Sequence, residues 1–79
     1  MDNTEKLKSI FASSLGIDES LVVDDLSYGT ISQWDSVAHM SLIADIEDAF
    51  EAMLDTDDII DMSSFAKVKE ILGKYDVIF

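Results

Sequence analysis

Apolar residues recur at helical spacing in four segments of the chain, which has no proline and only three glycines. The first segment runs from about Asn3 to Leu15 and stops at Gly16, which suits the left-handed position after a helix. The second spans about Ser36 to Glu51, and the third is short, from about Thr56 to Asp61. The fourth extends to about Tyr75. The pattern therefore predicts an all-α protein, a four-helix bundle with a long first loop and a short third helix.

The long connection from Gly16 to Asp35 is expected to pack across the bundle, because it carries six apolar residues. These are Ile17, Leu21, Val22, Val23, Leu26 and Ile31. The run 21–23 resembles a strand, but nothing else in the chain offers it a partner, and a lone strand is unstable. Ser63 or Ser64 is expected to cap the fourth helix. The expected anchors of the last two helices are Ile59, Ile60 and Met62, followed by Phe65, Val68, Ile71, Leu72 and Tyr75.

Length and charge limit the possible functions. A chain of 79 residues is expected to form one domain, residues 1–79, with a core too small to enclose a deep active site. A hydrophobic fraction of 48% is high enough for a folded domain despite the acidity. The net charge of −12 disfavours nucleic acid and anionic membranes as partners. It favours docking to basic patches on other proteins.

The sequence also indicates where such a protein works. It has no cysteine, which excludes disulfides, thiolate metal sites and thiol chemistry of its own. No apolar run approaches the length of a membrane span, and the first residues lack the features of a signal peptide. A cytoplasmic monomer without membrane insertion is the expectation.

The second predicted helix carries two apolar stripes. The expected core stripe consists of Leu42, Ile43, Ile46, Ala49, Phe50 and Met53. On nearly the opposite side lie Val37, Met40 and Ala44, bordered by Glu47, Asp48 and Glu51. A helix buried on one side has no structural need for a second stripe. We interpret it as a surface for docking a basic partner, although scattered apolar residues are also normal on protein surfaces.

Ser36 is the candidate for modification. Asp35 is a suitable N-cap, so Ser36 falls at the first helical position, exposed and fixed in place. A phosphate attached there would lie beside free N–H groups and the positive end of the helix dipole. No base stands near Ser36 in the sequence, so this serine is interpreted as modified and not as a nucleophile in an active site.

Residues around Ser36 resemble a known family. The tripeptide Asp35-Ser36-Val37 is similar to the Asp-Ser-Leu signature of acyl carrier proteins, and the likeness covers essentially the whole chain. An acidic linker, a short third helix and Ser-Phe-x-x-Val before the last helix extend it. The second helix matches the family's spacing at Leu42, Ile43, Ile46, Glu47 and Phe50.

The resemblance implies a carrier protein and not an enzyme. Ser36 would bear 4′-phosphopantetheine, delivered from coenzyme A by a phosphopantetheinyl transferase that recognises Asp35. The arm would hold acyl groups as thioesters and present them to acyl-loading and acyl-transfer enzymes with basic docking patches. Such carriers can shelter acyl chains between helices, and Met40, Met53 and Met62 are flexible side chains that would allow a cavity.

The segment Trp-Asp-Ser-Val-x-His-Met is more similar to discrete carriers of specialised pathways than to the carriers of housekeeping fatty-acid synthesis. Such pathways include lipid modification, polyketide-like assembly and surface-polysaccharide synthesis. Two alternatives are an acidic helical adaptor without a prosthetic group and an aminoacyl carrier.

Three other features have alternative interpretations. His39 is interpreted as packed or hydrogen-bonded, because an acid–base role would need a nearby nucleophile. Trp34 either wedges against the long loop, where its indole N–H needs a partner, or contacts a partner enzyme. Residues 55–61 resemble a calcium loop, but Ile60 stands where a glycine is required and Ala66 where a glutamate is required. No specific metal site is therefore expected, although adventitious binding of divalent cations to these acids is plausible.

Overall fold

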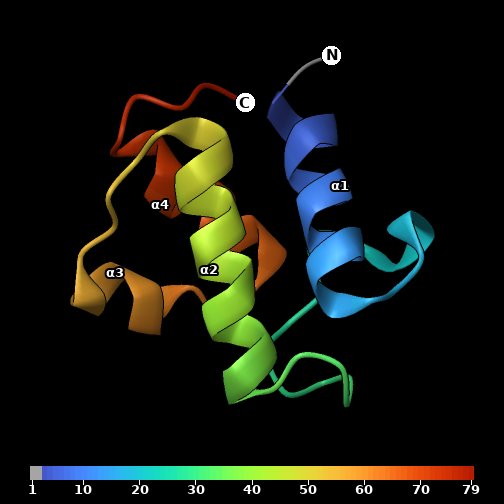
Figure 1. The fold of residues 1–79 in the computed structure, drawn as a ribbon. Coiled ribbons are helices and arrows are strands. Elements are labelled where there is room, and N and C mark those ends of the chain that lie inside the picture. Colours follow the sequence, from blue (N-terminus) through green and yellow to red (C-terminus); the bar gives the residue numbers. More distant parts are fainter. Residues whose placement is uncertain (1–2) are drawn as a thin grey trace.

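The computed structural model describes residues 3–79, which form four α-helices and one short 3₁₀ helix (Figure 1). The elements are α1 (Asn3–Leu15), η1 (Glu19–Leu21), α2 (Ser36–Phe50), α3 (Thr56–Asp61) and α4 (Phe65–Gly73). In Figure 1, α1 and α2 run side by side, α4 lies behind α2, and the short α3 lies at the left edge. The predicted all-α bundle with a long first loop and a short third helix is confirmed.

Side-chain and backbone caps define the helix ends. Asp35 accepts a hydrogen bond from the Ala38 N–H at 2.8 Å, as expected of the N-cap of α2. Ser64, and not Ser63, caps α4 by accepting from the Lys67 N–H at 3.1 Å. Gly16 follows α1 with a φ of +66°, a left-handed conformation that glycine adopts without strain. Glu51 is the C-cap of α2 with a φ of +53°, so α2 ends one residue before its predicted end.

The core is centred on three aromatic rings. Trp34 is only 1% exposed, and its ring meets Phe11 edge to face at 5.4 Å. Phe11 in turn meets Phe65 edge to face at 5.0 Å, which joins α1 to the start of α4. Edge-to-face pairs of this kind add about 0.5–1.5 kcal/mol each beyond their buried area. The loop residue Trp34 is thus part of the core that holds the helices together.

The long loop is fixed to the beginning of α4 by its backbone. The Tyr28 N–H donates to the Ser63 carbonyl at 2.7 Å, and the Phe65 N–H donates to the Leu26 carbonyl at 2.9 Å. Of the six apolar loop residues, Val22 and Leu26 are buried, whereas Ile17 and Ile31 are half-buried.

The loop packs across the bundle as predicted, but through these four residues, because Leu21 and Val23 are 52% and 50% exposed. The turn of η1, capped by Asp18, directs Val22 inward and leaves both neighbours outside.

The linker after α2 departs from the predicted core stripe. Met53 is 88% exposed, so its assignment to the core face is wrong. Because the helix ends at Phe50, the helical register does not continue to residue 53, and Leu54 takes the buried position instead. Glu47 accepts a hydrogen bond from the Leu54 N–H at 2.9 Å and fixes this linker to the last turn of α2.

The short helix α3 is held by a carboxylate that the apolar pattern did not reveal. Asp58 is buried and accepts from the Lys74 ammonium at 2.7 Å and from the Tyr75 hydroxyl. The hydrogen bond from Lys74, followed by that from Tyr75, lowers the pKa of Asp58 below its ordinary value. Ile60, predicted as an anchor, is 72% exposed, whereas Met62 is buried as expected. Asp58 replaces Ile60 as the anchor because its oxygens reach two donors at the end of α4.

Candidate functional site

Ser36 is exposed at the first residue of α2. The Asp35 carboxylate is exposed as well and accepts from the Ala38 N–H. The remaining N–H groups of the first turn precede the first intrahelical hydrogen bond, and the positive end of the helix dipole lies there. This end of α2 therefore suits an attached anionic group.

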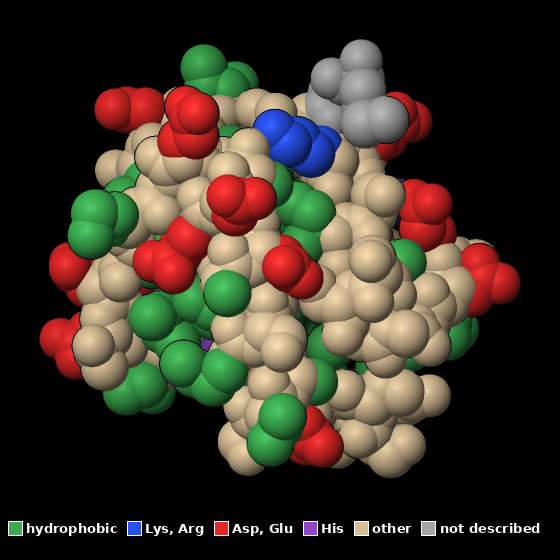
Figure 2. Space-filling model, in the orientation of Figure 1, with side chains coloured by type: hydrophobic (Ala, Val, Ile, Leu, Met, Phe, Trp, Pro, Cys, Tyr) green, Lys and Arg blue, Asp and Glu red, His purple; other side chains and the backbone are tan. Residues whose placement is uncertain are grey.

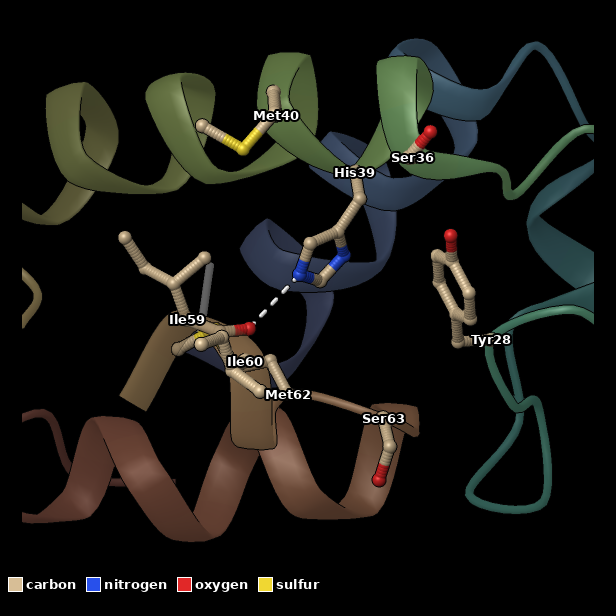
Figure 3. Close-up of a pocket in the computed structure, with 8 residues that line it drawn as sticks. All are labelled: Tyr28, Ser36, His39, Met40, Ile59, Ile60, Met62 and Ser63. Carbon is tan, nitrogen blue, oxygen red and sulfur yellow. Dashed lines mark hydrogen bonds between the residues drawn. The ribbon is translucent and has the colours of Figure 1, made fainter. Parts of the chain in front are cut away.

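A cleft of about 320 Å³ lies beside Ser36, between α2, α3 and the loop that carries Tyr28 (Figure 3). Apolar side chains from both helices, among them Met40 and Ile60, form most of its surface. The lining residues are Tyr28, Ser36, His39, Met40, Ile59, Ile60, Met62 and Ser63. The cleft thus joins an exposed hydroxyl to an apolar space large enough for part of a small ligand.

The methionines expected to allow a cavity behave differently from one another. Met40 and Met62 line the cleft, whereas Met53 is not among its lining residues. The contributions of Tyr28, Ile59, Ile60 and Ser63 were not foreseen. One sequence signal could have indicated the contribution of Ile60 to the cleft. It is an apolar residue on a six-residue helix that is otherwise largely acidic.

His39 forms the inner wall of this cleft. Its Nδ1 accepts from the Trp34 indole N–H at 3.0 Å, so its Nε2 carries the proton and donates to the Ile59 carbonyl at 2.9 Å (Figure 3). The rings of Trp34 and His39 are inclined to each other by 26°, with their centroids 6.1 Å apart, and Tyr28 meets His39 edge to face at 5.6 Å. Both nitrogens are engaged, which agrees with the interpretation of His39 as a hydrogen-bonded residue.

The same contacts decide between the two interpretations of Trp34. Its indole N–H donates to His39 Nδ1, which is the hydrogen-bond partner that a buried indole requires. Because the side chain is almost fully buried, it offers no surface to a partner enzyme.

The second stripe of α2 is exposed. Val37 is 76% exposed and Met40 59%, and Ala44 lies on the surface with them. Figure 2 shows hydrophobic side chains gathered over α2 and α3 on this face, with acidic side chains around them. Ile60 of α3 extends the apolar surface, since it shares the cleft with Met40.

The three acids that border this stripe are not equivalent. Asp48 and Glu51 are exposed. Glu47 is half-buried, and its carboxylate is engaged by the Leu54 N–H. Glu47 therefore has a structural role in addition to any contact with a partner.

Neither a metal centre nor a membrane span is evident in residues 3–79. Within that range no cluster of three or more His, Cys, Asp or Glu side chains is arranged to hold a metal ion. Over the same range, every helix is too short or too polar to cross a bilayer.

Comparison with known proteins places this arrangement among solved folds. No protein-family model and no curated protein matches the sequence. Among solved structures, the chain is similar to a holo acyl carrier protein from Geobacter metallireducens determined by solution NMR, with a TM-score of 0.79. The match covers 94% of this chain and 85% of that chain. The chain has the acyl carrier protein fold. Because the two sequences are 22% identical, the likeness concerns the arrangement of the helices.

Proposed function

We propose that this protein is an acyl carrier that holds acyl groups as thioesters on 4′-phosphopantetheine attached to Ser36. The observation that carries the proposal is the position of Ser36, exposed at the first residue of α2 in an acyl carrier protein fold and beside an apolar cleft. We place the carrier in a specialised lipid, polyketide-like or surface-polysaccharide pathway, in line with the sequence around Trp34.

The residues around Ser36 fit the proposed group. The phosphodiester would lie at the positive end of α2, where N–H groups of the first turn precede the intrahelical hydrogen bonds. Asp35 caps the helix and keeps its carboxylate on the surface, where a transferase could contact it. When bound, the arm supplies the thiol that a chain without cysteine lacks.

Loading requires one covalent step at the Ser36 hydroxyl. A bond forms between Ser36 Oγ and the phosphorus that bears the pantetheine, and the pyrophosphate bond of coenzyme A breaks. Adenosine bisphosphate leaves, and the hydroxyl proton passes to a base of the transferase. Because His39 is turned toward Trp34 and Ile59, we assign no base within this chain to the step.

Intact-mass measurement tests the attachment. The protein and its Ser36→Ala variant are incubated with coenzyme A and a broad-specificity phosphopantetheinyl transferase. We expect the parent to gain the mass of one phosphopantetheine and the variant to gain none. Thr30→Ala is a matched control, because it removes an exposed hydroxyl in the loop and leaves Ser36 intact. A mass gain in the Ser36 variant places the modification elsewhere, whereas no gain in any protein favours an acidic adaptor.

We further propose that partner enzymes dock on Val37, Met40 and Ala44 of α2, with Asp48 and Glu51 orienting basic side chains. The apolar residues are exposed beside the attachment site, and the acids flank them. Glu47 belongs to this surface as well, but reversing its charge would also release the linker at Leu54.

Charge reversal at the other two acids tests this surface. We expect Asp48→Lys with Glu51→Lys to raise the KM of the transferase for the carrier about 2- to 30-fold at low salt, because each exposed ion pair contributes about 0.2–1 kcal/mol. The difference should shrink as ionic strength rises. Glu19→Lys with Asp25→Lys changes the net charge equally on the exposed loop. An equal effect of this control pair would mean that overall charge, and not the α2 surface, governs docking.

A further inference from the structure

We infer that the hydrogen-bonded pair of Trp34 and His39 closes the inner end of the cleft and restricts the sheltered cargo to short and medium acyl chains. The inference rests on the proposed carrier function and names its substrate class. Its basis is the position of His39 between the cleft, which opens beside Ser36, and the aromatic core.

The imidazole bridges the two helices that form the cleft. His39 belongs to α2, and its Nε2 donates to the carbonyl of Ile59 on α3 at 2.9 Å (Figure 3). Its Nδ1 is fixed from the other side by the Trp34 indole N–H at 3.0 Å. With both nitrogens bound, the ring cannot rotate without losing a hydrogen bond. The inner wall of the cleft is therefore a fixed polar bridge, whereas the other walls are mostly flexible apolar side chains.

The space behind this wall is already filled. Trp34 lies beside His39 and is 1% exposed, and Phe11 packs edge to face against the indole. An acyl chain that passed His39 would leave the buried Trp34 indole N–H and the part-buried Ile59 carbonyl without partners. That loss exceeds what one or two additional buried methylene groups supply. A chain should therefore stop at His39 and turn toward the exposed rim at Met40 and Ile60.

The size of the cleft sets the length of the sheltered chain. A cavity of about 150 Å³ accommodates one benzene molecule, so a cleft of about 320 Å³ accommodates roughly twelve carbon atoms. Carbons beyond that number would lie outside, over the rim. The cargo class is accordingly acyl groups of up to about twelve carbons.

A series of acyl chains on the unaltered protein tests the limit. The transferase loads butyryl, octanoyl, dodecanoyl or hexadecanoyl groups from the corresponding acyl-coenzyme A, and intact mass reports the loading. The rate of thioester cleavage by hydroxylamine is then measured. We expect cleavage to slow from butyryl to dodecanoyl and to slow no further for hexadecanoyl. Continued slowing for hexadecanoyl, together with nuclear Overhauser contacts from its chain to Phe11, would overturn the inference.

Paired variants test His39 itself. His39→Ala removes the bridge and vacates the volume of the imidazole, so in this variant alone we expect cleavage to slow further between dodecanoyl and hexadecanoyl. Ile60→Ala removes apolar cover at the exposed rim without adding enclosed space, so it should change the rates without moving the length at which they level off. An unchanged levelling length in folded His39→Ala would overturn the inference. If that variant fails to fold, the nuclear Overhauser contacts between the hexadecanoyl chain and Phe11 in the unaltered protein test the inference instead.

The two proposals fail in distinguishable ways. If no protein in the series gains mass, the carrier function itself is wrong. If loading occurs but the protection has no limit near dodecanoyl, the carrier function stands and the length limit is wrong.

Discussion

At the scale of single residues, Asp35 combines two tasks that mutation can separate. Its side chain caps α2 through the Ala38 N–H, and its charge lies on the surface beside Ser36. An asparagine at this position keeps an oxygen for the cap but loses the charge.

We therefore expect Asp35→Ala to lower the free energy of unfolding by about 1 kcal/mol, the usual cost of a lost N-cap. Asp35→Asn should stay close to the parent in stability but slow the transfer of phosphopantetheine, because the proposed contact between the transferase and this side chain loses its charge. Urea denaturation gives the stabilities, and intact mass over time gives the transfer rate. Equal destabilisation by the two variants would show that charge at the helix end, and not the hydrogen bond, stabilises α2.

The residues of the site could be predicted from the sequence only in part. The exposed Ser36 and the Asp35 cap follow from helix-start chemistry, which depends on neighbours in sequence. The need of the Trp34 indole for a partner was also predictable, since a buried N–H requires one. That His39 is this partner was not predictable, because Trp34 lies outside the helix and helical angles say nothing about its direction.

At the scale of elements, α3 depends on one buried carboxylate for its position. Six residues give too few turns for an apolar stripe, which is why periodicity assigned Ile60 as an anchor and missed Asp58. Asp58 accepts from Lys74 and Tyr75 at the end of α4, and α3 in turn supplies Ile59 to the cleft. The hydrogen bonds of Asp58 therefore help to hold α3, and with it the Ile59 wall of the cleft, in place.

This contact predicts a pH dependence of stability. The pKa of Asp58 is lower in the folded protein than its ordinary value, chiefly because of the hydrogen bond from Lys74. Its contribution is therefore fully present above the unfolded pKa of 3.8 and is lost as pH falls through the lower folded value. We expect Asp58→Asn to be less stable than the parent near neutral pH.

The difference between parent and Asp58→Asn should shrink as the pH falls below the unfolded pKa. Urea midpoints of both proteins across this range measure it, and taking the difference removes the effect of the other acids. Asp57→Asn, an exposed neighbour on the same helix, is the control and should show no such trend. A difference that does not change with pH would contradict a charged Asp58 as the anchor.

At the scale of the whole molecule, the fold was accessible from the sequence because helix spacing and caps are local. The cleft was not, because its walls join residues of α2 to residues of α3 and to Tyr28 of the loop. Its volume depends on how these side chains pack, which no periodicity specifies. The same applies to Met53, whose position depends on where α2 ends.

Net charge also acts on the whole molecule and gives the last prediction. The chain has seventeen acidic and five basic residues, so its excess negative charges repel one another in the compact state. Salt screens this repulsion. We expect the melting temperature to rise between low salt and physiological ionic strength, by about 4–8 °C for each kcal/mol of repulsion removed. Magnesium chloride at equal ionic strength should raise it as well, because the divalent cation screens the same carboxylates. Calorimetry measures both. A melting temperature that does not change with salt would contradict self-repulsion, and a larger rise with magnesium would reveal specific cation binding.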